Sequence, residues 1–481
     1  MMTPTGRWTA GLAILVLLAG CGGPKRTHVA DAPEEPVPEP SMVADVPVEE
    51  LVEPKGPPED DVEQPAEAPE PEPAQVAPGP GEKPAAPVVT EEFRTLYDAT
   101  KAGDVTVVRQ CLDDGADVNG TNERGWTPLH AAVHENQPAV VKLLIERGAA
   151  VNPQGEMDWT PLHWAAQQGN LEMANTLLQA GADLAAVEWS GKTPLSLALV
   201  GGHLEVAERL IATGSDVNAA DEYGFSPLHI AANLGQTAMA RILLEKGANL
   251  HAATETGVTP VLMAVGNGRA ETLELLLKAG GSLQDKNGRG EGPLHIAAWE
   301  NQQEMVKALL EKGLEIDPRD IHDRTPLHGA ANRGWADMCD LLLDRGADIA
   351  ARDNQGYTPL QQAALSGDGE TVRRLIARGA DANTTKNDGI DILRSAVVGG
   401  NVDGVRAILA AGCDLERADA LKRTSLCIAA ELGNAEIVNL LLEAGANPDI
   451  VTELRTSPLQ MAQERGHQEV LEVFRKHGVE K

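Results

Sequence analysis

The amino-acid sequence predicts an all-α solenoid of about twelve helix-turn-helix repeats across residues 91–481. Thr127-Pro128-Leu129-His130 recurs in recognisable form at intervals of 33 residues or multiples of 33, and glycine recurs with the same period. The apolar residues are mostly Ala, Leu and Val, and only 3% of residues are aromatic, which suits helical cores better than sandwich cores. The length alone would suggest about three ordinary domains. A fixed period instead favours one domain that grows by addition.

Residues 1–20 have the pattern of a secretory signal peptide. Arg7 precedes an apolar run over 10–20, which is too short to span a bilayer comfortably. The run ends in Leu18-Ala19-Gly20-Cys21, which resembles a bacterial lipobox. That resemblance implies a lipid on Cys21, the new N-terminus, and Gly22 in place of Asp favours the outer membrane. The alternative is an ordinary signal peptide with an incidental cysteine. The sequence does not tell which side of the membrane the protein faces.

Residues 21–90 are predicted to form a disordered, Pro/Glu-rich tether behind the lipidated cysteine. Positions 22–90 hold 17 of the 31 prolines and no aromatic residue, with 16 acidic and four basic side chains. Such a composition cannot bury a core and favours extended polyproline II. Fully extended, the tether would reach about 200 Å. It is interpreted as a solvated spacer; the alternative is a peptide motif for a proline-recognising domain.

The repeats begin with a helix-start signal. Thr or Ser before Pro supplies an N-cap oxygen, and Pro suits the first helical turn. The copy at Asp391-Ile392-Leu393-Arg394 keeps the register but loses this motif. We therefore expect the weakest junction of the array near residues 380–425.

Two glycine ladders mark the helix ends. One follows the second helix of every repeat, from Gly115 to Gly478, and is glycine in all twelve copies. The other lies in the turn between the two helices and is glycine in ten copies, with Asn136 and Asn301 as its exceptions. Glycine and asparagine are the residues that tolerate a left-handed backbone, so both ladders predict positive φ angles.

The 33-residue spacing and the recurring residue types resemble the ankyrin repeat over about 390 residues. The resemblance implies two antiparallel helices and a projecting β-hairpin finger per repeat, stacked as a curved, monomeric solenoid. It also implies that the recurrent histidine hydrogen-bonds the backbone within and between repeats. In such proteins partners bind the concave face, which is built from finger tips and the ends of the first helices.

No pattern of catalytic or cofactor-binding residues is found. The net charge of −32 argues against a general nucleic-acid binder. Five histidines share one repeat slot without metal-ligand spacing, and no CxxC, GxSxG elbow, phosphate loop or EF-hand occurs. We therefore predict a protein that is not an enzyme and has no metal or cofactor. The sequence does not decide whether Cys413 and Cys427 form a disulfide.

The aromatic residues are the candidate partner-binding residues. Of the twelve aromatics within 91–481, seven fall in the expected partner-facing slots, where chance would place fewer than two: Trp126, Trp159, Trp189, Tyr223, Phe225, Trp299 and Tyr357. Trp and Tyr dominate binding hot spots. The alternative is that Trp126, Trp159, Phe225 and Tyr357 merely pack finger on finger. Nearby acidic residues would steer a basic patch of the partner: Glu123, Glu156, Glu188 and Glu222.

Together these features predict a non-catalytic, lipid-anchored protein-interaction module of the bacterial cell envelope. It would serve as a scaffold or as an inhibitor or immunity-type protein. Two alternatives are an effector delivered to a host cell, against which the lipobox argues, and an enzyme, for which the uninterrupted 33-residue register leaves no room. Neither the identity of the partner nor the choice between scaffold and inhibitor follows from the sequence.

Overall fold

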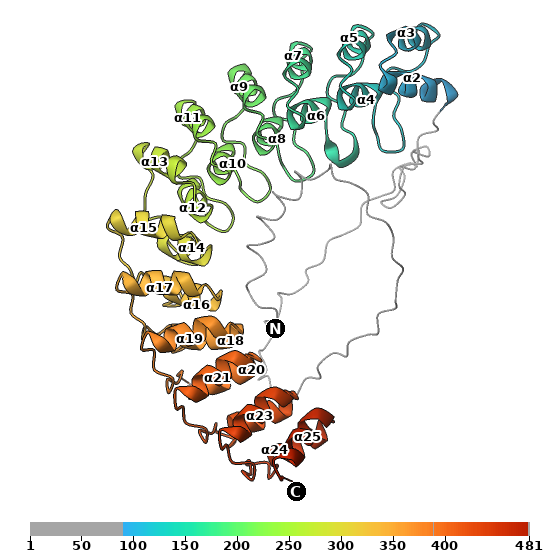
Figure 1. Cartoon of the computed structure of the whole chain (residues 1–481). Helices are drawn as coiled ribbons and strands as arrows, with labels where there is room; N and C mark the ends of the chain where they lie inside the picture. Colours follow the sequence, from blue (N-terminus) through green and yellow to red (C-terminus); the bar gives the residue numbers. More distant parts are fainter. Residues whose placement is uncertain (1–89, 388, 480–481) are drawn as a thin grey trace, which may run out of the picture. The chain divides into compact units, whose positions relative to one another are not determined.

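The computed structural model describes residues 90–387 and 389–479. The predicted signal peptide, Cys21 and the predicted tether before residue 90 lie outside the described residues. Within 90–479 the chain forms twelve helix pairs in series. Figure 1 shows them as a curved array, with the first helix of each pair in an inner row and the second in an outer row.

The helices have nearly constant length from repeat to repeat. The first helices are α2 (Glu91–Ala102), α4 (Pro128–His134), α6 (Pro161–Gln167), α8 (Pro194–Val200), α10 (Pro227–Leu234), α12 (Pro260–Gly266), α14 (Pro293–Trp299), α16 (Pro326–Asn332), α18 (Pro359–Ser366), α20 (Ile392–Val398), α22 (Ser425–Leu432) and α24 (Pro458–Glu464). The second helices are α3 (Val105–Asp113), α5 (Pro138–Glu146), α7 (Leu171–Gln179), α9 (Leu204–Thr213), α11 (Thr237–Glu245), α13 (Ala270–Lys278), α15 (Gln303–Glu311), α17 (Ala336–Asp344), α19 (Gly369–Ala377), α21 (Val402–Ala410), α23 (Ala435–Glu443) and α25 (Gln468–Lys476). One short 3-10 turn, η1 (Glu156–Asp158), interrupts the pattern.

The helix-start signal works as predicted. Thr127 precedes α4, and its hydroxyl accepts a hydrogen bond from His130 N at 3.4 Å. In return, the Thr127 N–H donates to His130 Nδ1 at 3.2 Å. The histidine therefore completes a capping box, a role that Glu or Gln usually fills.

Both glycine ladders have the left-handed backbone that was predicted. Gly115 and its eleven equivalents have φ between 77° and 110°. In the inter-helix turns, the two exceptions Asn136 and Asn301 have φ of 54° and 56°. An alanine at these places would lose a helix-ending conformation that only glycine and asparagine adopt cheaply.

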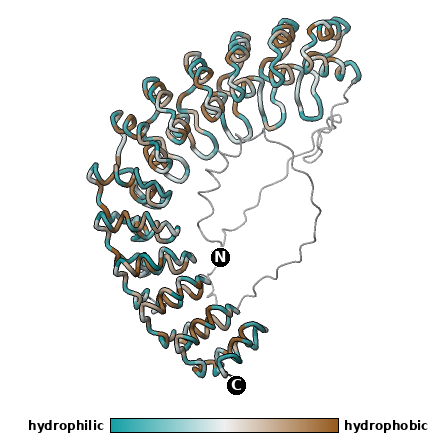
Figure 2. The backbone as a smooth tube through the Cα atoms, in the orientation of Figure 1, coloured by the Kyte–Doolittle hydropathy of each residue, from teal (hydrophilic) through white to brown (hydrophobic). Residues whose placement is uncertain are grey.

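The core is a continuous apolar layer between neighbouring repeats. Leu129, Leu162, Leu195 and Leu228 occupy the same slot in consecutive first helices and are fully buried. In Figure 2 the hydrophobic residues lie mainly in the helices, and the connecting segments are mostly hydrophilic or neutral. Since each repeat buries its face only against its neighbours, the array is stabilised interface by interface.

The segments between repeats form the fingers, each running from the glycine after one second helix to the next first helix. We number the eleven fingers from residues 116–127 onward, in steps of 33. They are tight turns rather than extended hairpins: in the described residues the only β-bridge is the antiparallel pair Thr385 and Asp391. Each arm is too short to add further ladder bonds.

Candidate protein-binding surface

In most fingers, the side chain at the base shapes the tip. In finger 4, Asp221 Oδ1 accepts hydrogen bonds from Tyr223 N at 3.0 Å and Phe225 N at 2.9 Å. Asp353 holds finger 8 in the same way. Such Asx turns fix the backbone locally, so the side chains that follow them project from a defined position.

From finger 2 to finger 9, each finger is joined to the next by one backbone hydrogen bond. The Trp189 N–H donates to Met157 O at 3.0 Å, and Glu222 N–H donates to Ser190 O at 3.2 Å. The same bond recurs from finger to finger as far as Asn387 N–H to Gln355 O at 3.1 Å. The fingers therefore form a row with regular spacing that does not depend on their side chains.

Trp189 and Tyr223 are the two candidate aromatics that the structure leaves most exposed. Trp189 is 55% exposed and Tyr223 is 42% exposed, on the adjacent fingers 3 and 4. Neither ring contacts another aromatic ring among the described residues. Large exposed aromatic side chains on a fixed backbone are the usual anchors of protein interfaces, because little conformational entropy is lost when they are covered.

A buried ionic cluster lies within the two fingers that carry these aromatics. Lys192 Nζ lies 3.9 Å from Asp221 Oδ2 and donates to Ser190 Oγ at 2.7 Å, and both charged side chains are nearly inaccessible. Ser190 in turn bonds to Glu188. Burial raises the pKa of Asp221, outweighing the hydrogen bond from Phe225 N–H and the Lys192 charge. The cluster ties fingers 3 and 4 together.

Trp126 and Trp159 belong to a different arrangement, an aromatic groove at fingers 1 and 2. Both rings contact Trp164 of α6, with centroid distances of 5.2 and 4.5 Å. An open groove of about 620 Å³ lies here, lined also by Tyr97 and the exposed Met157. In the described residues no backbone bond of the usual kind joins finger 1 to finger 2, where Met157 itself has a positive φ.

The sequence analysis missed Trp164. It lies one position after the slot histidine, on the face of the first helix that the groove exposes. The same slot holds Ile230, Met263 and Ile296 in other repeats. A search that had included this slot among the partner-facing ones would have found it.

The other three candidate aromatics are half-buried and packed within the array. Phe225 stacks edge-on against His229 at 6.0 Å. Lys386 lies 5.0 Å from the centre of the Tyr357 ring, and Arg333 lies 5.2 Å from that of Trp299. These contacts favour a packing role for Phe225 and Tyr357, as the alternative interpretation had it.

The predicted acidic rim is present only in part. Glu123, Glu156 and Glu222 are exposed, and Glu156 lies 3.8 Å from Arg124. The expectation for Glu188 is wrong, because this side chain is buried and accepts hydrogen bonds from Ser190 N and Lys192 N. It occupies the turn-forming position that Asp221 holds in the next finger, so it cannot steer a partner.

The slot histidines form a ladder between repeats. His130 Nε2 bonds to Trp159 O at 2.9 Å, and four others repeat this contact to the carbonyl 29 residues on. Burial lowers the pKa of His163 and of His229 to about 4, so both are neutral near pH 7. This agrees with the role that the resemblance implied.

At positions 361 and 394, which lack the histidine, another residue type makes the same contact. Gln361 donates through Nε2 to Ile390 O at 3.3 Å, and Arg394 bonds to Arg423 O. Asp391 caps α20 by accepting from Arg394 N at 2.8 Å. The repeat that lacks the Thr-Pro motif therefore keeps both an N-cap and an inter-repeat bond.

Neither the histidines nor the cysteines form a metal-ligating or redox site in the described part of the chain. No group of three His, Cys, Asp or Glu residues there could hold a metal ion. Cys111, Cys339, Cys413 and Cys427 are free thiols. Burial raises the pKa of Cys339 to about 12 and that of Cys413 to about 11.

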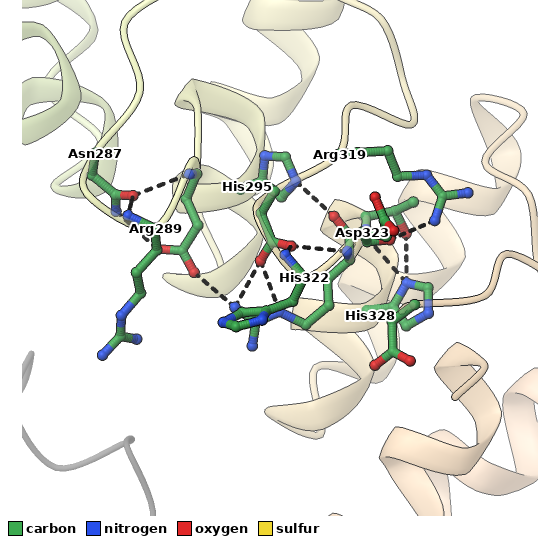
Figure 3. A network of polar contacts seen from close by, with 12 residues as sticks. Asn287, Arg289, His295, Arg319, His322, Asp323 and His328 are labelled. Atoms are coloured by element: carbon green, nitrogen blue, oxygen red, sulfur yellow. Dashed lines mark hydrogen bonds and ion pairs between the residues drawn. The ribbon is translucent and has the colours of Figure 1, made fainter. Parts of the chain in front are cut away.

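A second surface feature was also missed: exposed cations at one slot of three consecutive fingers. Lys286, Arg319 and Arg352 are each exposed and lie 33 residues apart. Figure 3 shows Arg319 in the polar network of fingers 6 and 7, close to Asp323. A slot-by-slot reading of charge, rather than of aromatic residues alone, would have found this row.

A family model described as Ankyrin repeats (3 copies) matches residues 96–188, 184–254, 247–320, 316–386 and 392–481. The chain belongs to the ankyrin repeat family. The solved ankyrin repeat domain of Bcl-3, a member of the IkappaB protein family, is 28% identical. The match covers 45% of this chain and 97% of that chain, with a TM-score of 0.41. No curated protein matches significantly.

Ankyrin repeat domains are typically protein–protein interaction modules and are generally non-catalytic. The exposed finger tips give this ankyrin array the features such a module needs. Among the described residues there is no helix of the length and apolarity required to cross a bilayer.

Proposed function

We propose that this ankyrin protein is a lipid-anchored interaction module of the bacterial cell envelope, which captures a protein partner through the aromatic residues of its first four fingers. The anchor would be a lipid on Cys21, with the outer membrane favoured. Trp189 and Tyr223 would be the central contacts. Trp126 and Trp159 would extend the contact area through the groove.

The observation that carries this proposal is the exposure of Trp189 and Tyr223 on fingers that are held rigid. The Lys192–Asp221 pair and the bond from Glu222 N to Ser190 O fix both fingers. Anchors that are ordered before binding lose little entropy on binding. The exposed acidic side chains Glu222, next to Tyr223 in finger 4, and Glu123, in finger 1, favour a partner with a basic patch.

The test is capture of the partner from crosslinked envelopes by the full-length protein. Trp189→Ala and Tyr223→Ala should leave the circular dichroism spectrum and unfolding midpoint intact and abolish capture. The chain offers matched controls: Ile321 occupies the slot of Trp189 and Leu454 that of Tyr223, and both are exposed. Ile321→Ala and Leu454→Ala should capture the partner normally. Unchanged capture by the aromatic variants would refute the proposal.

The same experiment separates the forms that this function could take. If the captured partner is an enzyme whose activity falls on binding, the protein acts as an inhibitor. If its activity is unchanged, the scaffold role is favoured.

The anchor is tested independently of the partner. Cys21→Ser should shift the protein from the membrane fraction to the soluble fraction and remove metabolic labelling by palmitate. Membrane retention of the variant would contradict lipid attachment at Cys21. Protease shaving of intact cells then distinguishes a surface-facing from a periplasm-facing array, and recovery from the culture medium would favour a delivered effector.

A further inference from the structure

Lys286, Arg319 and Arg352 form a row, which we call the cationic ladder, on fingers 6, 7 and 8. All three side chains are exposed, and none takes part in an ion pair among the described residues. In the five preceding fingers the same slot holds uncharged residues: Thr121, Gln154, Val187, Ala220 and Ala253. The ladder is therefore a local feature and not part of the repeat pattern.

Each arginine of the ladder is held by one end of its guanidinium group. Arg319 Nη1 donates to Asp323 O of its own finger and to Arg352 O of the next finger, the latter at 2.7 Å. Arg352 Nη1 donates in the same manner to Gly356 O at 3.0 Å and Thr385 O at 2.6 Å. Lys286 Nζ lies 3.5 Å from Arg319 O. These acceptors are neutral carbonyls, so the positive charges stay uncompensated.

The other edge of each guanidinium is available. In the described residues Nε and Nη2 of Arg319 and Arg352 have no acceptor. This edge is the one that binds a carboxylate through two parallel hydrogen bonds. Since Nη1 is already fixed, little side-chain entropy is lost when a carboxylate binds.

Linking the fingers does not require these cations. Fingers 6 to 8 are already joined by backbone bonds, from Ile321 N to Arg289 O at 3.1 Å and from Asn354 N to His322 O at 2.9 Å. The same bonds join earlier fingers, where the slot carries no charge. Stabilisation of the row of fingers therefore does not explain why three cations occupy this slot.

We propose that the cationic ladder docks an extended acidic peptide that presents a carboxylate at every third residue. Packed helices lie about 8–10 Å apart, which sets the spacing of consecutive fingers. Polyproline II rises about 3.1 Å per residue with three residues per turn, so every third side chain returns to the same face after about 9 Å. A β-strand would turn its third side chain to the opposite face. The ladder therefore suits acidic, proline-rich segments.

A polynucleotide fits the surface less well. Duplex DNA carries about one negative charge per 1.7 Å, far more than three cations at the spacing of packed helices, about 8–10 Å, can neutralise. Base stacking would need exposed aromatic rings. Tyr357 is half-buried and already lies beneath Lys386.

The experiment measures fluorescence anisotropy of labelled peptides with the full-length protein. The probe is a peptide of five Glu-Pro-Pro units, and the control has the same composition with its glutamates clustered. The spaced peptide should bind about tenfold more tightly than the clustered one, and raising the ionic strength from about 0.05 to 0.3 M should weaken it. Arg319→Gln and Arg352→Gln should each lower the affinity about tenfold.

Two further variants keep the result interpretable. Arg455→Gln removes an exposed arginine from finger 11 and should bind like the wild type. Trp189→Ala should also bind the peptide normally, which separates this proposal from the one for the aromatic fingers. Equal binding of the two peptides, unchanged affinity in the folded Arg319 and Arg352 variants, or tighter binding of an oligo-dT strand would overturn the proposal.

Discussion

The first five fingers and the six that follow have the same backbone and different side chains. Fingers 1 to 5 carry five aromatic residues and only two basic ones, whereas fingers 6 to 11 carry one aromatic residue and ten basic ones. The same finger-to-finger backbone bonds join fingers 2 to 5 and fingers 6 to 9. The backbone therefore sets the spacing of this surface, and the residues in the variable slots set its chemistry.

The two groups also differ in where they place a positive charge. In finger 3, Lys192 is 5% exposed and lies among Glu188, Ser190 and Asp221. In finger 6, Lys286 is exposed and its Nζ lies 3.5 Å from the carbonyl oxygen of Arg319. Charge is part of the interior in the first region and part of the surface in the second.

Removing one lysine from each region should have very different effects on the free energy of unfolding. Lys192→Met leaves the buried Asp221 carboxylate without its cation and should cost about 3–5 kcal/mol of unfolding free energy. Lys286→Met should change it by no more than about 0.5 kcal/mol. Urea unfolding followed by circular dichroism measures both. A loss below about 1 kcal/mol for Lys192→Met would show that the cluster does not stabilise the fingers.

Acid should destabilise the repeats that carry slot histidines more than the repeats that lack them. His163 and His229 have a pKa of about 4 when folded and about 6.5 when unfolded, so their neutral form stabilises the fold. That contribution is complete above pH 6.5 and is lost as the pH falls toward 4, at up to about 3 kcal/mol per histidine. Hydrogen exchange at pH 4.5 should therefore show a larger loss of protection over residues 116–358 than over residues 359–481, where Gln361 and Arg394 occupy the histidine slot.

A matched variant isolates the histidine contribution. Gln361 makes both hydrogen bonds of the slot without titrating, so His229→Gln should keep the neutral-pH stability and flatten the acid dependence. An unchanged pH profile in this variant would mean that other groups control the acid response.

The repeat without the Thr-Pro motif should show a smaller effect. Loss of a threonine cap costs about 1 kcal/mol, although Asp391 and Arg394 replace part of it. Native-state hydrogen exchange near neutral pH should give lower protection over residues 380–425 than over the preceding repeat. Uniform protection across both would show that the substitute contacts are sufficient.

The smallest expected effect is that of a reducing agent. A disulfide between Cys413 and Cys427 would close a short loop and contribute about 3 kcal/mol, but both are free thiols in the structure. The unfolding midpoint should be the same with and without dithiothreitol. A drop on reduction would establish the bridge in the folded protein.

The fold could be predicted from the sequence because its signals are local and repeated. Gly148 and Asn136 predict left-handed turns, and Thr127 with Pro128 predicts a helix start, independently of the rest of the chain. Repetition removes the ambiguity that one such signal would leave.

The candidate site was only partly predictable because exposure depends on neighbouring repeats. Trp189 and Trp159 occupy nearby slots of adjacent fingers, yet the first is exposed and the second packs against Trp164. Glu188 looked like a surface carboxylate, but the turn of finger 3 draws it inside. The 33 residues of one repeat do not determine how its side chains pack against the neighbouring repeat.

The unbroken run of finger-to-finger bonds from Met157 to Asn387 has a consequence for how such a protein can change over time. Because those bonds use only backbone atoms, a substitution at a tip leaves the spacing of all other tips untouched. New specificities can then arise one position at a time, by drift or by design, without passing through misfolded intermediates. The same property makes this array a scaffold whose recognition surface can be rewritten slot by slot.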